Sequence, residues 1–114
     1  MKDFYDIYYL SKTIDFDGAK LQSTISETLK RRDTLYNKDS FKRIVALAQN
    51  KDMQSRWSHF LKTINDDTLK FSVVIQTIQN FLEPIFDTIV RADKWKKVWN
   101  STDSKWEEIK KNGQ

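Results

Sequence analysis

The sequence predicts an all-α protein, a single helical bundle of about five to six helices. The 114 residues include only two glycines and one proline, so few residues interrupt a helix. Apolar residues recur at the spacing of one helix face in five separate segments. No segment has the pattern of a convincing β-strand, and there is no internal repeat.

The first expected helix covers residues 3 to about 11 or 12. Its apolar residues share one face, which can pack against the bundle: Phe4, Ile7 and Tyr8. Asp3 and Asp6 share another face, because they lie three positions apart. The helix is therefore expected to be anchored on one side and to present two acids on the other.

A second helix is expected after a loop at residues 13–18, with Asp17 as its N-cap. Every fourth residue along it is apolar: Leu21, Ile25 and Leu29. The helix ends in Lys30, Arg31 and Arg32, cations that complement the negative end of a helix dipole.

Two further helices follow in the expected order. Asp39 or Ser40 caps the third, whose apolar positions follow the helical period: Phe41, Ile44, Val45 and Ala48. Asn50 separates it from the fourth and caps the latter. The fourth has a wide apolar stripe: Met53, Trp57, Phe60, Leu61 and Ile64.

The fifth helix is the longest, and Asp67 or Thr68 is its expected cap. Its apolar residues keep the helical period over about five turns, from Phe71 onward. Pro84 lies inside this pattern, lacks an N–H and clashes with the carbonyl of Asn80. We therefore expect a kink or a break into two helices near Pro84.

Residues 1–109 are expected to form one helical domain, and residues 110–114 a frayed tail. The helical pattern loosens after residue 93, where three tryptophans are expected to tie the chain to the bundle: Trp95, Trp99 and Trp106. Because cations stand between the first two of them, stacking on nucleic-acid bases is an alternative role.

Composition excludes several classes of protein. The absence of cysteine excludes disulfides and thiolate metal sites, and it fits a cytoplasmic protein. No apolar run approaches the roughly 20 residues of a membrane span, and no signal peptide begins the chain. The formal charge of +4 is compatible with a nucleic-acid or nucleotide partner.

Several segments, taken in order, resemble a known family. They are Lys-Asp-Phe-Tyr-Asp-Ile-Tyr-Tyr-Leu-Ser at 2–11, Ile14-Asp15, the segment 21–34 with Thr28, Leu29, Arg32 and Thr34, Phe81-Leu82-Glu83-Pro84, and Trp99 and Trp106. This set is similar to the C-terminal half of the AbiEii/AbiGii-type toxins. Those are nucleotidyltransferase-like proteins of bacterial toxin–antitoxin and abortive-infection systems.

The resemblance implies a catalytic role for Lys2, Asp3 and Asp6, with Asp6 the preferred contributor. In that family an N-terminal lobe supplies a nucleotide-binding loop and metal-binding carboxylates, and a Lys-Asp-x-x-Asp segment of the helical half borders the site. Carboxylates there would hold a divalent metal or accept a proton from the attacking hydroxyl. The alternative is that Asp3 caps its helix and Asp6 pairs with a cation at the surface.

The sequence lacks a glycine-serine nucleotide loop, since Gly18 and Gly113 are far apart. Asp15 and Asp17 spell Asp-x-Asp, but they lie between two helical patterns, and the single His59 excludes a multi-histidine site. No metal site and no cofactor is therefore predicted for this chain alone, which is expected to be inactive by itself. For the full-length family the resemblance implies Mg²⁺ and a nucleoside triphosphate.

A basic region is the second candidate site. Arg32, Arg31 and Lys38 are its predicted nucleotide- or RNA-binding residues, and Arg32 matches the family pattern. If the second and third helices are antiparallel neighbours, Lys42 and Arg43 converge with them. The alternative is a solvated face that complements the helix dipole.

These observations favour a C-terminal helical domain or fragment of an AbiEii-type toxin, which closes the nucleotide or RNA-acceptor cleft. Met1 directly before Lys2 and Asp3 is expected to be a start within a longer protein. The implied partners are an N-terminal nucleotidyltransferase lobe, a cognate antitoxin, a tRNA or nucleotide, and a second copy of the chain, with no membrane. The alternatives are an independent helical protein-interaction or regulatory module and a compact RNA-binding domain.

Overall fold

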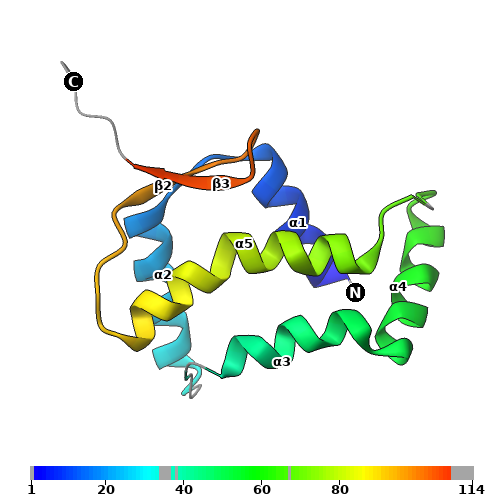
Figure 1. Ribbon diagram of the computed structural model, residues 1–114, viewed down its shortest axis with the longest axis horizontal. Helices are drawn as coiled ribbons and strands as arrows, with labels where there is room; N and C mark the ends of the chain where they lie inside the picture. The colour runs from blue at the N-terminus through cyan, green and yellow to red at the C-terminus, as the bar shows by residue number, and fades with distance from the viewer. Residues whose placement is uncertain (1, 34–36, 38, 67, 109–114) are drawn as a thin grey trace.

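A computed structural model describes residues 2–33, 37, 39–66 and 68–108 of the chain. The elements occur in the following order: α1 (Lys2–Thr13), β1 (Phe16–Asp17), α2 (Gly18–Arg31), α3 (Ser40–Ala46), the 3₁₀ helix η1 (Leu47–Gln49), α4 (Lys51–Thr63), α5 (Phe71–Val90), β2 (Lys97–Asn100) and β3 (Lys105–Glu108). Figure 1 shows α5 crossing the middle of the molecule.

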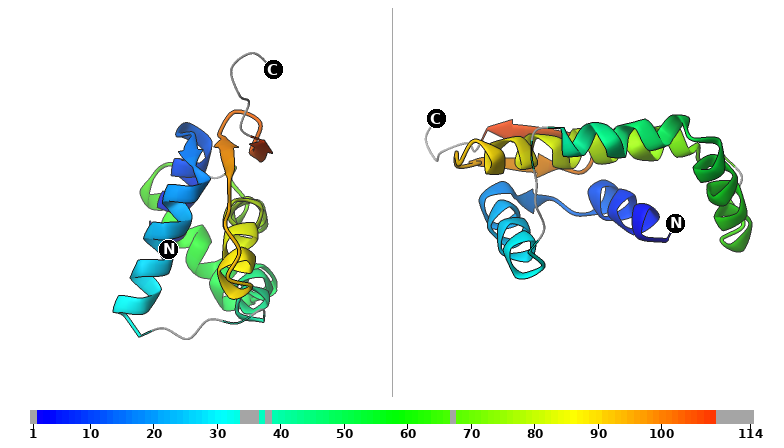
Figure 2. Two further views of the ribbon diagram at one scale, coloured as in Figure 1. Left: turned by 90° about the vertical axis from the view of Figure 1, so that its left-hand side faces the viewer. Right: turned by 90° about the horizontal axis from the view of Figure 1, so that it is seen from below.

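The helices form two layers. Figure 2 shows α1 and α2 in one layer, and α3, α5 and strands β2 and β3 in the other. Helix α4 lies at one end of the molecule and is linked to the start of α5 by the segment around residues 64–70. None of the described helices is both long and apolar enough to cross a membrane.

Helix α5 supplies most of the core. Its periodic apolar side chains are buried: Phe71, Val74, Ile75, Ile78, Phe81 and Ile85. Side chains of α3, η1, α4 and β2 complete the core: Phe41, Ala48, Trp57, Leu61 and Trp99. Trp57 also donates its indole N–H to the carbonyl of Leu69 at 2.8 Å, and this bond fixes the segment before α5.

The prediction of an all-α protein is wrong, because three strands form an antiparallel sheet in the order β1-β2-β3. Phe16 pairs with Trp99, and Trp99 pairs in turn with Trp106. Residues 97–108 are therefore a β-hairpin, which we call the C-terminal hairpin, and not a loose continuation of the helices. Residues 110–114, where a frayed tail is predicted, lie outside the described residues.

Of the two outcomes predicted at Pro84, a kink or a break into two helices, the break does not occur, since α5 runs without interruption from Phe71 to Val90. Pro84 leaves the Asn80 carbonyl without its usual intrahelical donor. The next carbonyl, that of Phe81, accepts a hydrogen bond of 2.9 Å from the indole N–H of Trp106. The buried face on both sides of the proline keeps the helix in one piece.

Two predicted N-caps are confirmed. Asp17 accepts hydrogen bonds from the first backbone N–H groups of α2, and Asn50 accepts one from Met53 at the start of α4. Asp39 precedes α3 but makes no capping bond through its side chain. The predicted Thr68 cap is wrong, because α5 begins after Lys70, and Asp67 lies outside the described residues.

Candidate functional site

The predicted catalytic residues lie on the solvent side of α1. Lys2, Asp3 and Asp6 are all exposed, and we call these three residues the acid face. The Lys2 ammonium lies 3.5 Å from the Asp6 carboxylate, in an ion pair that solvent surrounds. Such a pair is weak and easily opened, so a ligand could displace Lys2 from Asp6 at little cost.

The opposite side of α1 explains this orientation. The ring of Phe4 packs edge-on against Phe71, with 5.7 Å between ring centroids. The rings of Tyr5 and Phe60 of α4 also pack together, with 5.5 Å between their centroids. Ile7 and Tyr8 pack against the same core. Because these side chains must be covered, the acid face is turned toward solvent.

Exposed apolar residues stand in the second half of α1 and directly after its end, and we call them the α1 apolar patch: Tyr9, Leu10 and Ile14. Their side chains are 55, 41 and 45% exposed. Leu10 lies one turn after Asp6, so the patch continues the acid face along the helix. Helical periodicity did not indicate this patch, although Leu10 stands outside the apolar spacing of the buried face.

The predicted basic site is at the other end of the same layer. Arg31 and Arg32 are exposed at the C-terminal end of α2, and they form no ion pair among the described residues. Figures 1 and 2 show this end of α2 well apart from the first turns of α1. The acid face and the cations are therefore two separate sites, and Lys38 and Thr34 lie outside the described residues.

The Asp-x-Asp segment has a structural role. Asp15 accepts hydrogen bonds from both the backbone N–H and the hydroxyl of Ser101, each at 2.8 Å. These bonds, the backbone one first, lower the pKa of the Asp15 carboxyl. With Asp17 occupied as the cap of α2, the described residues contain no group of three potential metal-ligating acids, histidines or cysteines.

The tryptophans also serve the fold. Trp99 is 1% exposed and donates its indole N–H to the carbonyl of Ser11 at 2.7 Å, so a base cannot stack on it. Trp106 is held edge-on between Trp95 and Trp99. His59 is exposed on α4 and makes no hydrogen bond or ion pair within the described part of the chain.

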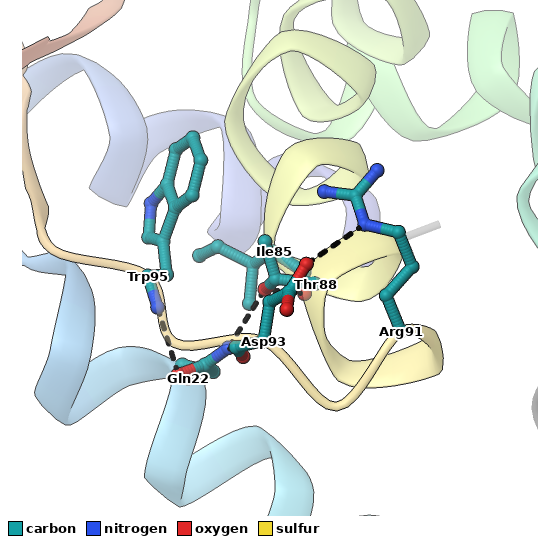
Figure 3. A network of polar contacts seen from close by, with 6 residues as sticks. All are labelled: Gln22, Ile85, Thr88, Arg91, Asp93 and Trp95. Carbon is teal, nitrogen blue, oxygen red and sulfur yellow. Dashed lines mark hydrogen bonds and ion pairs between the residues drawn. The ribbon is translucent and has the colours of Figure 1, made fainter.

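A polar network fixes α2 against the end of α5 (Figure 3). The side-chain amide nitrogen of Gln22 donates to the Thr88 hydroxyl at 2.7 Å and to the backbone carbonyl of Asp93 at 2.8 Å. Its amide oxygen accepts from the backbone N–H of Trp95 at 3.1 Å. An open groove of about 550 Å³ lies beside this network, between α2 and the C-terminal end of α5. Serine hydroxyls, Glu27 and Lys30 give it a mixed lining, which favours no single ligand.

Comparison with known proteins supports the resemblance. Residues 1–97 match the model of the family described as "Nucleotidyl transferase AbiEii toxin, Type IV TA system". The match includes α1, α2 and α5 and ends at the first residue of β2. No curated protein and no solved structure matches the chain. Because the matched residues cover most of its length, the chain belongs to the AbiEii nucleotidyl transferase toxin family of type IV toxin–antitoxin systems.

Proposed function

We propose that this chain is the helical wall of a nucleotidyl-transfer cleft, whose other wall is a nucleotidyltransferase lobe. The observation that carries the proposal is the acid face: two carboxylates and a lysine at the surface of a helix that is anchored from behind. Membership of a nucleotidyl transferase family supplies the reaction class. The chain alone is expected to be inactive. Its proposed location is the cytoplasm, where nucleoside triphosphates and RNA are found.

Asp6 is proposed to act on the reacting groups, with Asp3 beside it. A carboxylate at this position can accept the proton of the attacking hydroxyl. Two carboxylates also fit the share that a protein commonly contributes to Mg²⁺, which takes its remaining ligands from phosphates and water. Bound Mg²⁺ would neutralise the triphosphate, and Lys2, released from Asp6, would contact a phosphate oxygen.

The α1 apolar patch is proposed to be part of the surface that holds the lobe. It continues the acid face along the same helix, so a lobe that reaches Asp6 also reaches Leu10. Exposed apolar side chains gathered on one segment favour contact with another protein surface. A cognate antitoxin is proposed as a further partner, since the family is one of toxins of toxin–antitoxin systems.

Arg32 and Arg31 are proposed to contact the phosphates of an RNA acceptor such as a tRNA, together with Lys38. Neither arginine is engaged by an acid among the described residues. The expected signature is an RNA affinity that falls with salt and falls further when Arg31 and Arg32 are replaced by glutamate.

The proposal is tested by mixing this chain with the nucleotidyltransferase lobe of a longer family member. Transfer of labelled nucleotide from a triphosphate to RNA is then measured. Asp6→Asn is expected to lower the rate at least about 100-fold, the usual contribution of a positioned acid or base. Asp52→Asn is the matched control, since Asp52 is also exposed and paired with a cation four positions away.

A second candidate function is an independent protein-interaction or regulatory module, which the α1 apolar patch also favours. It predicts that no lobe restores transfer, and that Leu10→Lys disrupts self-association or partner binding. A mixture with no transfer at all, or one in which Asp6→Asn and Asp52→Asn behave alike, would exclude the acid face as a catalytic element.

A further inference from the structure

The C-terminal hairpin contacts the C-terminal end of α1 and the segment that follows it. Strand β2 pairs with β1, through Phe16 with Trp99 and Asp17 with Val98. The Lys12 ammonium donates to the Ser104 hydroxyl at 2.7 Å. Almost the whole hairpin lies beyond the residues that the family model matches, so the family match assigns it no role.

Trp99 is the central contact. Its indole N–H donates to the carbonyl of Ser11, and both residues are essentially inaccessible to solvent. A hydrogen bond in such a place is costly to lose, because the partners left behind cannot turn to water. It therefore fixes the height and the rotation of the last turn of α1.

Asp15 supplies the second directional contact. One carboxylate oxygen accepts both the N–H and the hydroxyl of Ser101, which stands at the end of β2. The hairpin is in turn attached to α5, since Trp106 donates to the Phe81 carbonyl and stacks on the Phe81 ring at 5.9 Å. The hairpin thus joins the end of α1 to the central helix α5.

The first half of α1 has contacts of a different kind. It rests on α5 and α4 through the rings of Phe4 and Tyr5 and through Ile7. Apolar contacts of this sort favour burial but set direction weakly. Among the described residues, the hydrogen bonds that α1 makes with other elements go to the hairpin, through Lys12 and Ser11. Asp15, which binds Ser101, lies two residues after the end of the helix and fixes the segment that follows it.

We infer that the C-terminal hairpin is a clamp that sets the direction of α1 and so positions the acid face, with Trp99 and Asp15 as positioning residues. The inference rests on the proposed function, and it assigns to a segment outside the family match the task of presenting Asp3 and Asp6. Loosening the clamp is expected to leave the helices folded and to let α1 change its tilt against α5, with the contacts of Phe4 and Tyr5 as the pivot.

The absence of cysteine allows a direct test by spin labelling. One pair of labels, at Tyr9→Cys and Val73→Cys, reports α1 against α5, and both positions are exposed. A second pair, at Ser55→Cys and Val90→Cys, reports α4 against α5. Distance distributions are measured by pulsed electron paramagnetic resonance in the full chain.

Asp15→Ala and Trp99→Phe are each expected to broaden the α1–α5 distribution and to leave the α4–α5 distribution unchanged. Asp15→Asn keeps the acceptor oxygen and is expected to restore the narrow distribution. Asp52→Ala, at another exposed aspartate, is expected to change neither distribution. An α1–α5 distribution that stays narrow in both clamp variants overturns the inference, and so does a broadening that Asp15→Asn fails to reverse.

A transfer assay with the added lobe separates this inference from the proposed function. In an active mixture, Asp15→Ala is expected to lower kcat at least tenfold with little change in KM for the triphosphate. Broadened distances with an unchanged kcat would overturn the positioning role and leave the proposed function standing. An unmutated mixture without transfer would overturn the proposed function, and with it the claim that the clamp serves catalysis.

Discussion

The indole N–H of Trp106 donates to the carbonyl of Phe81 at 2.9 Å, three residues before Pro84. The two rings are also nearly parallel, with an interplanar angle of 11°. A side chain from the hairpin thus supports α5 on the turn where proline removes a backbone donor. Four consequences of this and of the other tertiary contacts can be measured.

Pro84→Ala is expected to raise the free energy of unfolding by about 1–2 kcal/mol, a part of the roughly 3 kcal/mol that an interior proline costs. Alanine restores the N–H that can donate to the Asn80 carbonyl, and α5 already has helical geometry at this position. Urea unfolding checks the value. A decrease in stability would mean that the helix geometry near Pro84 depends on the proline ring.

Gly18→Ala is expected to destabilise the fold by about 1–3 kcal/mol, the usual cost of overpacking. The added Cβ would clash with the carbonyl oxygen of Lys97 and lie 2.6 Å from Cδ1 of Trp95. In an unobstructed helix the same change stabilises by roughly 0.5–1 kcal/mol. The sign of the change in stability therefore shows whether the contacts around Gly18 are as close as the structure has them. Ser23→Ala, on the exposed side of α2, serves as control in the same thermal or urea unfolding measurement.

Gln22→Glu is expected to cost about 1–3 kcal/mol at neutral pH, because it replaces an N–H₂ donor by a charged acceptor. Thr88, which is 3% exposed, already gives its hydroxyl proton to the carbonyl of Ile85 and has none left for a carboxylate. The deficit should shrink as acid protonates the new side chain. Gln76→Glu, at an exposed position of α5, is the isosteric control and should stay within about 0.5 kcal/mol.

Acid is expected to weaken the attachment of the hairpin through Asp15. Hydrogen bonds from the N–H and hydroxyl of Ser101 lower the pKa of the folded Asp15 carboxyl. Its contribution to stability is therefore complete above the ordinary aspartate pKa of about 3.9, and it is lost as the pH falls through the lower folded value.

Asp15→Asn is accordingly expected to lower Tm at pH 7, and the difference from the unmutated chain should vanish toward pH 2. Thermal unfolding followed by circular dichroism between these pH values measures it. Hydrogen bonds from Thr68 also lower the pKa of Asp66, so its contribution to stability is lost over the same pH range. Because Asp66 is present in both proteins, this contribution cancels in the Tm difference. A Tm difference that does not change with pH would show that the charge of Asp15 contributes nothing.

The helices could be predicted because their signal is local. Spaced apolar residues and the caps Asp17 and Asn50 stand within a few positions of the turns they stabilise. The exposure of Asp3 and Asp6 also followed from periodicity, once Phe4 and its neighbours had defined the buried side. No such rule indicated the α1 apolar patch, because its residues do not continue the apolar spacing of the buried face. In the proposed function, the surface that covers the patch belongs to the nucleotidyltransferase lobe.

The sheet could not be predicted, because its signal is not local. β1 has only two residues, and these also serve as the loop and cap before α2. β2 and β3 have four residues each, too few for alternation to be distinctive. The turn between them contains no glycine, and Ser104 adopts a positive φ of 53° instead, so the usual hairpin signature is missing.

The pairing of Phe16 with Trp99 has a consequence for how the protein is made. A ribosome releases α1 and α2 long before it has added the strand that holds them, and contacts between distant residues form late and slowly. A nascent chain will therefore carry an unfastened first helix until residues 97–100 have been added and have left the ribosome. Stable placement of α1 is in this way tied to the synthesis of a strand about 80 residues further along the chain.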